Sequence, residues 1–142
     1  SQSSCREMKA KVIDFLNCGD GRGQLAAVES GITVPFEIKR VYYIYGTRPG
    51  VERGFHAHKT LQQVAVAVSG SCEMVLDDGT SKTSYKMDSP QRGIYIHPGV
   101  WRVMCNFSDD CVLLVFADQV YDESDYIRDY KAFLSWKNRL DD

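Results

Sequence analysis

Short runs of β-branched and aromatic residues, each ended by glycine, proline or aspartate, restrict the fold of this chain more than any other feature. Residues 41–45 form one such run, and residues 77–79 read Asp-Asp-Gly, which closes tight β-hairpins because it tolerates positive φ angles. The runs continue from residue 9 to residue 120 without helical segments between them. Many short strands at regular spacing predict an antiparallel sandwich or barrel. We therefore expect an all-β fold.

The hydrophobic period changes near the C-terminus from that of strands to that of a helix. The residues that would form one helical stripe are Tyr126, Ile127, Tyr130, Phe133 and Leu134. Ser124 is a suitable N-cap, and Asp125 would favour the positive end of the helix dipole. We expect a helix over about 124–137 that packs this stripe on the sheet. Residues 1–7 are polar, and residues 1–8 are expected to form a flexible leader to a single domain over 9–142.

Composition excludes several classes of partner. A net charge of −2 over 142 residues gives no basic excess that would attract nucleic acid or an anionic membrane. The longest apolar run is too short to cross a bilayer. Five cysteines, an odd number without a Cys-x-x-Cys pair, indicate reduced thiols rather than a disulfide framework. We therefore expect a cytoplasmic protein with neither a nucleic-acid partner nor a membrane.

Two histidines separated by one residue are the main candidate for chemistry. Side chains alternate along a strand, so His56 and His58 would project from the same face, between the cations Arg53 and Lys59. Two imidazoles on one face form either half of a metal site or a proton-transfer pair.

Two further sequence positions argue against a metal site at this histidine pair. A His-x-His pair on a small β-barrel suggests the cupin superfamily, whose metal-binding members hold the ion with three histidines and a glutamate. Here Gln63 stands in the place of the glutamate and Arg102 in the place of the last histidine. Glutamine is a weak, neutral ligand, and arginine cannot lose its proton to coordinate a metal. No metal is expected, His97 receives no role, and the histidine pair is interpreted as acid–base groups.

The pocket that holds the two histidines would also contain several cationic side chains. They are Arg53, Lys59 and Arg102, with Arg22 and Arg40 as further candidates. This set suits proton abstraction beside the carbonyl of an anionic substrate, because cations stabilise the enediolate that forms.

A longer series of segments carries a family resemblance. The segments are residues 35–44 (PFEIKRVYYI), 53–59 (RGFHAHK), 63–64, 70–72, 76–79, 93–96, 100–101 and 121–128 (YDESDYIR). With them the chain resembles the cupin-fold sugar-nucleotide 3,4-ketoisomerases over nearly its whole length after Met8. These enzymes act on dTDP-4-keto-6-deoxyglucose in pathways to 3-amino-3,6-dideoxyhexoses.

The resemblance implies a cupin (jelly-roll) barrel with a C-terminal helix and a tautomerisation that needs no cofactor. It makes His56 the catalytic base, His58 its partner in proton transfer and Tyr42 a catalytic residue of the hexose pocket. The substrate-binding residues that it implies are Arg22, Arg40, Arg53, Lys59, Gln63 and Arg102. Arg40 and Arg53 would bind the pyrophosphate, since guanidinium groups pair with phosphate oxygens in bidentate fashion. The family also implies a homodimer with exchanged N-terminal strands.

Two positions bear on the configuration of the product at C4. Arg22 stands where the family varies between arginine and tyrosine, and Arg102 where it varies between histidine and arginine. Arg22 indicates a galacto product and Arg102 a gluco product, with the galacto product slightly favoured.

Three other functions are possible for such a barrel. A dTDP-sugar 3,5-epimerase would pair its base histidine with an aspartate elsewhere, and the sequence shows no such motif. A non-catalytic sugar-nucleotide-binding module would not need the intact His56 and His58. A metal-dependent oxygenase is disfavoured by Gln63 and Arg102.

Overall fold

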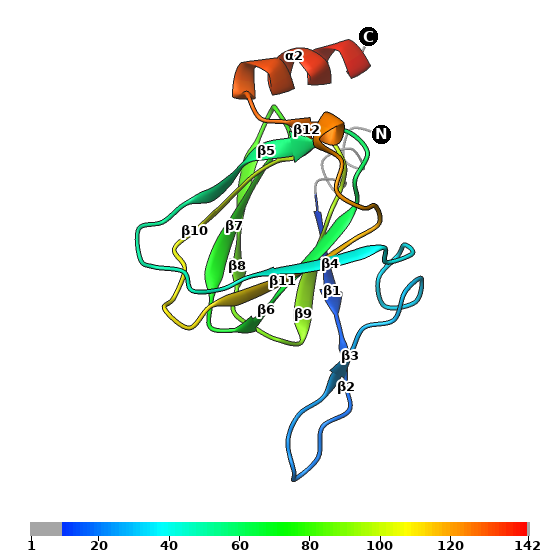
Figure 1. Ribbon diagram of the computed structural model, residues 1–142, viewed down its shortest axis with the longest axis vertical. Coiled ribbons are helices and arrows are strands. Elements are labelled where there is room, and N and C mark those ends of the chain that lie inside the picture. The colour runs from blue at the N-terminus through cyan, green and yellow to red at the C-terminus, as the bar shows by residue number, and fades with distance from the viewer. Residues whose placement is uncertain (1–9, 142) are drawn as a thin grey trace.

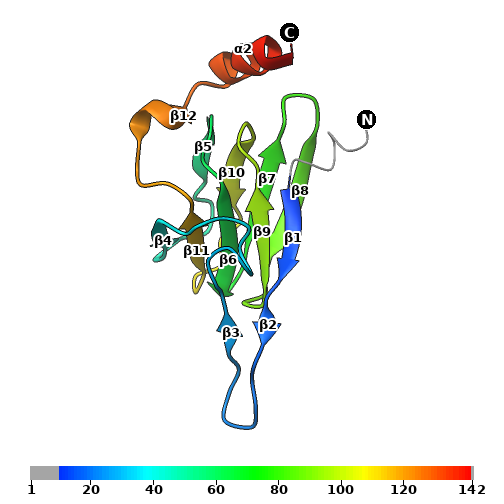
Figure 2. The same cartoon turned by 90° about the vertical axis from the view of Figure 1, so that its right-hand side faces the viewer.

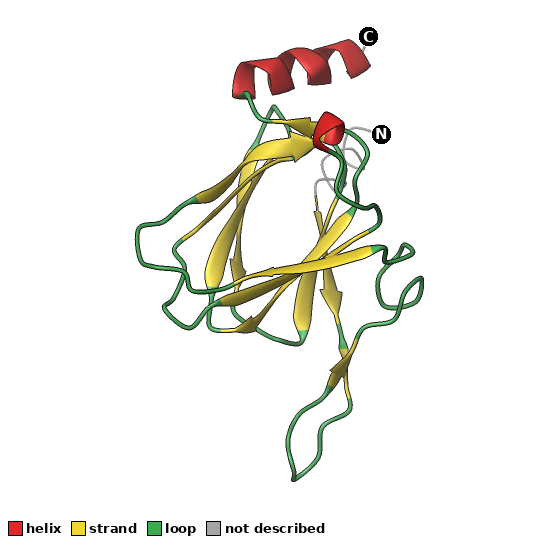
Figure 3. Cartoon of the chain, viewed as in Figure 1, coloured by secondary structure: helices red, strands yellow, loops and turns green. Residues whose placement is uncertain are grey.

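The computed structural model describes residues 10–141, so the leader expected over 1–8 lies outside the described residues. Two five-stranded sheets face each other, and one helix follows them at the C-terminus (Figures 1 and 3). The predicted all-β barrel with a C-terminal helix is confirmed. No helix within residues 10–141 is both long enough and apolar enough to cross a membrane.

The first sheet contains, in spatial order, β1 (Ala10–Asp14), β9 (Arg92–Ile96), β6 (Gln63–Ser69), β11 (Val112–Ala117) and β4 (Arg40–Ile44). The second contains β12 (Tyr126–Ile127), β5 (Arg53–His58), β10 (Trp101–Cys105), β7 (Cys72–Asp77) and β8 (Lys82–Met87). Neighbouring strands in both sheets run antiparallel. The Asp-Asp-Gly sequence lies in the turn between β7 and β8, as its composition predicts.

Strand β6 shows how the sheets divide the apolar side chains. Ala65 and Ala67 face the second sheet and belong to the main core between the two sheets. Val64 and Val66 face the other way and are buried under the segment 28–38, which covers the outer face of the first sheet. A strand covered on both faces needs apolar residues at every position, which explains its nearly continuous apolar sequence.

Strand β4 has one face inside the sandwich and the other in solvent. Tyr42 and Ile44 pack against the main core, whereas Val41, Tyr43 and Tyr45 are exposed. This alternation places Tyr42 on the inner face at the edge of the sandwich.

The segment after β11 differs from the helix expected over 124–137. Residues Glu123–Asp125 form the 3-10 helix η1, Tyr126–Ile127 form β12, and the α-helix α2 covers Tyr130–Asp141. The predicted start was wrong because Tyr126 and Ile127 pair with the end of β5, and Asp129 rather than Ser124 accepts the helical N–H of Ala132. The predicted packing is partly retained, since Phe133 is buried against Trp101 and Ile127.

A hairpin of β2 (Leu16–Asn17) and β3 (Ala26–Ala27) projects from the barrel as an arm, which Figures 1 and 2 show from two sides. Leu16 and Leu25 on this arm are exposed. The arm therefore offers apolar surface that the rest of the described chain does not cover.

Candidate active site

The predicted catalytic residues gather at one edge of the sandwich. A cavity of about 370 Å³ opens there between β4, β5, β10 and the segment 121–128 that precedes α2. Its wall includes Arg40, Tyr42, Arg53 and His56, four of the residues that the sequence predicted. Strands β4 and β5 belong to different sheets (Figure 1), so the cavity is bounded by both layers.

A local distortion of β5 sets the position of His56. The pairing of β5 with β10 shifts by one residue, so that Phe55 is an extra residue at a β-bulge. Gly54 there has a φ of 96°, and a Cβ on it would lie 2.8 Å from the carbonyl oxygen of Arg102. Only glycine fits this approach. The bulge leaves Phe55 half exposed and turns His56 into the cavity, where its Nδ1 lies 3.1 Å from the carbonyl oxygen of Gly54.

His58 lies deeper than His56. The two imidazole rings are 5.0 Å apart in an edge-to-face arrangement, as expected for side chains two residues apart on a strand. His58 is only 1% exposed, and its Nδ1 lies 3.2 Å from Oδ2 of Asp125. The ring of Tyr126 packs against both imidazoles, with centroids 4.3 Å from His58 and 5.0 Å from His56.

Gln63 and Arg102, predicted to bind substrate, lie behind the cavity wall rather than in it. Both are almost fully buried. The Arg102 guanidinium donates to Oε1 of Gln63 and to the carbonyl oxygen of Val100. Gln63 in turn donates from Nε2 to the hydroxyl of Tyr42 at 2.9 Å. Because this hydroxyl accepts from Gln63, its own proton is available for donation into the cavity.

Burial and charge keep both imidazoles neutral. Desolvation, and then the nearby charge of Arg102, lower the pKa of His56 to about 4 and that of His58 to about 2. Burial also lowers the pKa of Arg102 to about 10, which leaves this group charged at neutral pH. Burial raises the pKa of Tyr42, although the charge of Arg102 opposes this. The free protein thus presents a neutral base and a protonated phenol.

Cationic and aromatic groups line the rest of the cavity. The guanidinium carbon of Arg40 lies 5.2 Å from the ring centroid of Tyr42 and 5.7 Å from that of Tyr121. Arg128 stacks on Tyr126 at 4.2 Å and pairs with Glu123 at 2.7 Å. Together with Arg53 these groups make the cavity suited to an anion.

Besides the buried His58, Gln63 and Arg102 behind its wall, two predicted residues do not line this cavity. Lys59 lines a neighbouring groove of about 430 Å³ between β12 and α2. Arg22 lies near the tip of the hairpin arm, where its side chain is 92% exposed and bonded to Asp20. Figures 1 and 2 both show this tip far from β5 and β12.

The sequence did not identify Tyr121, Asp125, Tyr126 or Arg128 as site residues. The helix expected over 124–137 includes Asp125, Tyr126 and Arg128, and Tyr121 lies just before it, although 121–128 is one of the segments that resemble the family. This resemblance was the available signal, because the two-residue spacing of Tyr126 and Arg128 has meaning only once the structure shows an extended segment.

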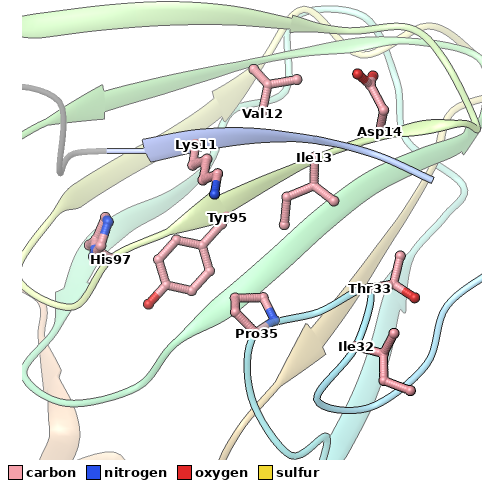
Figure 4. Close-up of a pocket in the computed structure, with 9 residues that line it drawn as sticks. All are labelled: Lys11, Val12, Ile13, Asp14, Ile32, Thr33, Pro35, Tyr95 and His97. Carbon is pink, nitrogen blue, oxygen red and sulfur yellow. The ribbon is translucent and has the colours of Figure 1, made fainter.

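A second cavity, of about 530 Å³, lies beside β1 on the outer face of the first sheet (Figure 4). Tyr95 and His97 line it with their rings 4.6 Å apart in an edge-to-face contact. None of the nine predicted site residues lies in its wall. Its larger volume therefore does not make it the better candidate for the active site.

The fold and the first cavity define a class of protein. Residues 10–141 contain no group of three or more His, Cys, Asp or Glu side chains arranged to hold a metal ion. A cupin-type barrel with two neutral imidazoles, a tyrosine hydroxyl and several guanidinium groups at its mouth has the groups required for proton transfer beside a carbonyl. This combination is that of a cupin-fold isomerase.

Comparison with known proteins identifies the family. The model of the family described as "FdtA: WxcM-like, C-terminal" matches residues 8–138. The chain is 51% identical over 126 residues to the TDP-4-oxo-6-deoxy-alpha-D-glucose-3,4-oxoisomerase of Aneurinibacillus thermoaerophilus, covering 89% of this chain and 91% of that protein. The chain belongs to this family of sugar 3,4-ketoisomerases and is an isomerase.

Solved structures agree with this assignment. The sugar 3,4-ketoisomerase QdtA of Thermoanaerobacterium thermosaccharolyticum, in complex with TDP, superposes with a TM-score of 0.91 at 39% identity, covering 93% of this chain and 96% of its own. A 3,4-ketoisomerase of Helicobacter canadensis gives a TM-score of 0.90 at 47% identity, with coverages of 92% and 98%.

Proposed function

We propose that this chain converts dTDP-4-keto-6-deoxyglucose into a dTDP-3-keto-6-deoxyhexose. The observation that carries the proposal is the position of His56, a neutral imidazole in the wall of a cavity lined by guanidinium groups. The relative of known activity acts on the same 4-keto sugar, and the QdtA structure holds TDP. The ketone at C3 of this product is the group that an aminotransferase would need in 3-amino-3,6-dideoxyhexose synthesis.

The reaction needs one proton to leave C3 and one to arrive at C4. His56 removes the C3 proton, and the C–H electron pair forms the C3–C4 double bond of an enediol. The former C4 carbonyl oxygen gains a proton as its negative charge develops, and the hydroxyl of Tyr42 is placed to stabilise that oxygen. The enediol then collapses: C4 receives a proton, and the C3 hydroxyl loses its proton to become the new carbonyl. His58 takes part in these proton transfers.

The cations of the cavity bind the nucleotide. Arg40 and Arg53 are in its wall, and Arg128, which the sequence did not single out, joins them there. Guanidinium groups suit the two phosphates because each presents a planar pair of donors. Gln63 and Arg102 contribute indirectly, through their bonded chain to Tyr42. Lys59 lies in the neighbouring groove, from which its positive charge would attract the anionic substrate over a longer distance.

A homodimer with exchanged N-terminal strands would give Arg22 a role. The arm that carries Arg22 exposes Leu16 and Leu25, and the outer face of β4 exposes Val41 and Tyr43. Apolar patches of this kind mark interaction sites. Arg22 cannot serve the cavity of its own chain from the arm tip, so we assign it to the cavity of the partner. There it would bind substrate, so that its loss slows turnover, and would act with Arg102, which works through Gln63 and Tyr42, on the configuration at C4, for which we retain the galacto product as slightly favoured.

The reaction can be tested by following the sugar by NMR in D2O. After treatment with a chelator, the protein should convert dTDP-4-keto-6-deoxyglucose into a 3-keto sugar with deuterium at C4. The same spectrum reads the C4 configuration. An unchanged 4-keto sugar would contradict the proposed isomerisation, and dependence on added metal would contradict the metal-free mechanism.

A 3,5-epimerase is the alternative that one observation favours. The sequence shows no aspartate motif for a base histidine, yet the structure places Asp125 against His58. Epimerisation would introduce deuterium at C5, whereas isomerisation introduces it at C4. The D2O experiment therefore separates the two functions.

The exchanged dimer predicts complementation between two inactive variants. Arg22→Ala and His56→Asn homodimers should each turn over slowly, because each lacks one group at both sites. If equal amounts of the two variants mix at random, about half of the dimers are heterodimers. Each heterodimer has one intact site and one site that lacks both groups, so the mixture should recover about a quarter of wild-type turnover. A mixture no more active than its components, or a monomer in light scattering, would refute the exchange.

A further inference from the structure

Asp125 is a buried carboxylate that the mechanism above does not use. It lies in η1, on the segment that crosses the end of β5, and its side chain is 8% exposed. Three donors besides His58 surround it: the N–H of Thr60 at 2.8 Å, the hydroxyl of Thr60 at 2.7 Å and the N–H of Leu61 at 3.2 Å. All of these groups belong to the end of β5 or the turn after it.

This arrangement determines which nitrogen of His58 carries the proton. An ionised carboxylate only accepts hydrogen bonds, so a bond between Asp125 Oδ2 and His58 Nδ1 requires the hydrogen to be on Nδ1. A neutral imidazole has a single N–H, which leaves Nε2 with its lone pair. The backbone N–H groups of Thr60 and Leu61, one on each carboxylate oxygen, keep it in this orientation.

The Nε2 atom of His58 is buried and has no hydrogen-bond partner among the described residues. A buried acceptor without a partner is uncommon in native proteins and needs an explanation, which a role in proton transfer supplies. The ring that carries it lies 5.0 Å from the ring of His56. The unpaired Nε2 of His58 is thus available to accept a proton close to His56, the proposed base.

We propose that Asp125 is a positioning residue that holds His58 in the Nδ1–H tautomer and so makes Nε2 the proton-accepting atom beside His56. When Nε2 gains a proton, the carboxylate offsets the positive charge of the imidazolium, which burial and then the charges of Arg102, Arg40 and Arg128 otherwise disfavour. The catalytic part of this inference rests on the proposed function, whereas the tautomer does not.

The variant Asp125→Asn tests the inference. Its amide oxygen can still accept from Thr60, but its NH2 group would donate to Nδ1 of His58 and shift the ring hydrogen to Nε2. We expect kcat to fall by about 10²–10⁴-fold, with KM and the affinity for TDP within about 3-fold of wild type, because only the proton acceptor is lost. Nitrogen NMR of histidine-labelled protein should show Nδ1 protonated in the wild type and Nε2 protonated in the variant.

Thr60→Val is the matched control. It removes one donor to Asp125 and loosens the contact between η1 and β5 without changing the bond to His58. We expect a lower Tm with kcat within about 3-fold of wild type. Wild-type turnover in Asp125→Asn, or an equal loss of kcat in both variants, would overturn the positioning role.

The NMR measurement separates this inference from the proposed function. It needs no substrate, and in the wild type alone it decides the tautomer even if Asp125→Asn does not fold. An unprotonated Nδ1 in the wild type would refute the inference. A wild-type protein with the expected tautomer but no isomerase activity would instead refute the proposed function and with it the catalytic part.

Discussion

Replacing His56 with asparagine should lower kcat by about 10²–10⁴-fold, the range expected when a general base is removed. Asparagine is smaller than histidine, but its amide nitrogen can keep the polar contact with the carbonyl oxygen of Gly54, and it has no basic nitrogen. The guanidinium groups of Arg40, Arg53 and Arg128 remain, so the affinity for TDP should change by less than about 3-fold. Substrate consumption by NMR gives kcat, and calorimetry with TDP gives the affinity.

His97→Asn provides the matched control for this loss. His97 lies in the cavity beside β1, on the outer face of the first sheet, and makes its ring contact with Tyr95. Its replacement should leave kcat within about 2-fold of wild type, since a residue outside the site has no part in the proton transfer. Retention of turnover in His56→Asn would show that another group removes the C3 proton.

The free energy of unfolding should begin to fall as the pH drops below about 6.5, which is well above the pH at which ordinary carboxylates take up protons. The pKa of His56 falls to about 4 and that of His58 to about 2 in the folded chain, against 6.5 for a free imidazole. Between these values the unfolded chain binds protons that the folded chain does not, so stability falls as the pH falls below 6.5. At pH 5 each histidine should contribute a loss of about 2 kcal/mol relative to pH 8.

Urea unfolding at pH 8 and pH 5 measures this loss, which should total about 4 kcal/mol for the pair. In His56→Asn the difference between the two pH values should fall by about half, because one of the two titrating groups is gone. Below pH 4 the contribution of His56 stops growing, since the folded form is then protonated as well. A wild-type stability that is unchanged between pH 8 and pH 5 would contradict the lowered pKa values.

Much of the site could be predicted because strands have a fixed period. Alternation on β5 brings the rings of His56 and His58 together, and alternation on β4 turns Tyr42 inward. The substitution of Gln63 and Arg102 in the metal motif could likewise be recognised from residue type alone. These inferences need only local geometry and the chemistry of single side chains.

The features that the sequence did not reveal, among them the wrong start of the C-terminal helix, depended on long-range contacts. Tyr126 and Ile127 fit a helical stripe, yet pairing with β5 and the bonds between Asp125 and the turn at Thr60 hold the segment extended. Arg102 stays a proposed substrate-binding residue, and the register of β10 places it behind Tyr42, a position that no local pattern indicates. Partners more than 60 residues apart in the chain leave no local pattern that reveals them.

The sequence by itself determined the all-β class, the shared face of the histidine pair and the chemistry of the groups near it, because these follow from side-chain type and a two-residue period. Only the tertiary structure decided which residues surround that pair. Burial between two sheets lowers the pKa of both imidazoles, and a carboxylate from a distant segment reaches the buried one. Desolvation and such contacts are properties of the packed chain, and they turn two adjacent histidines into distinct groups.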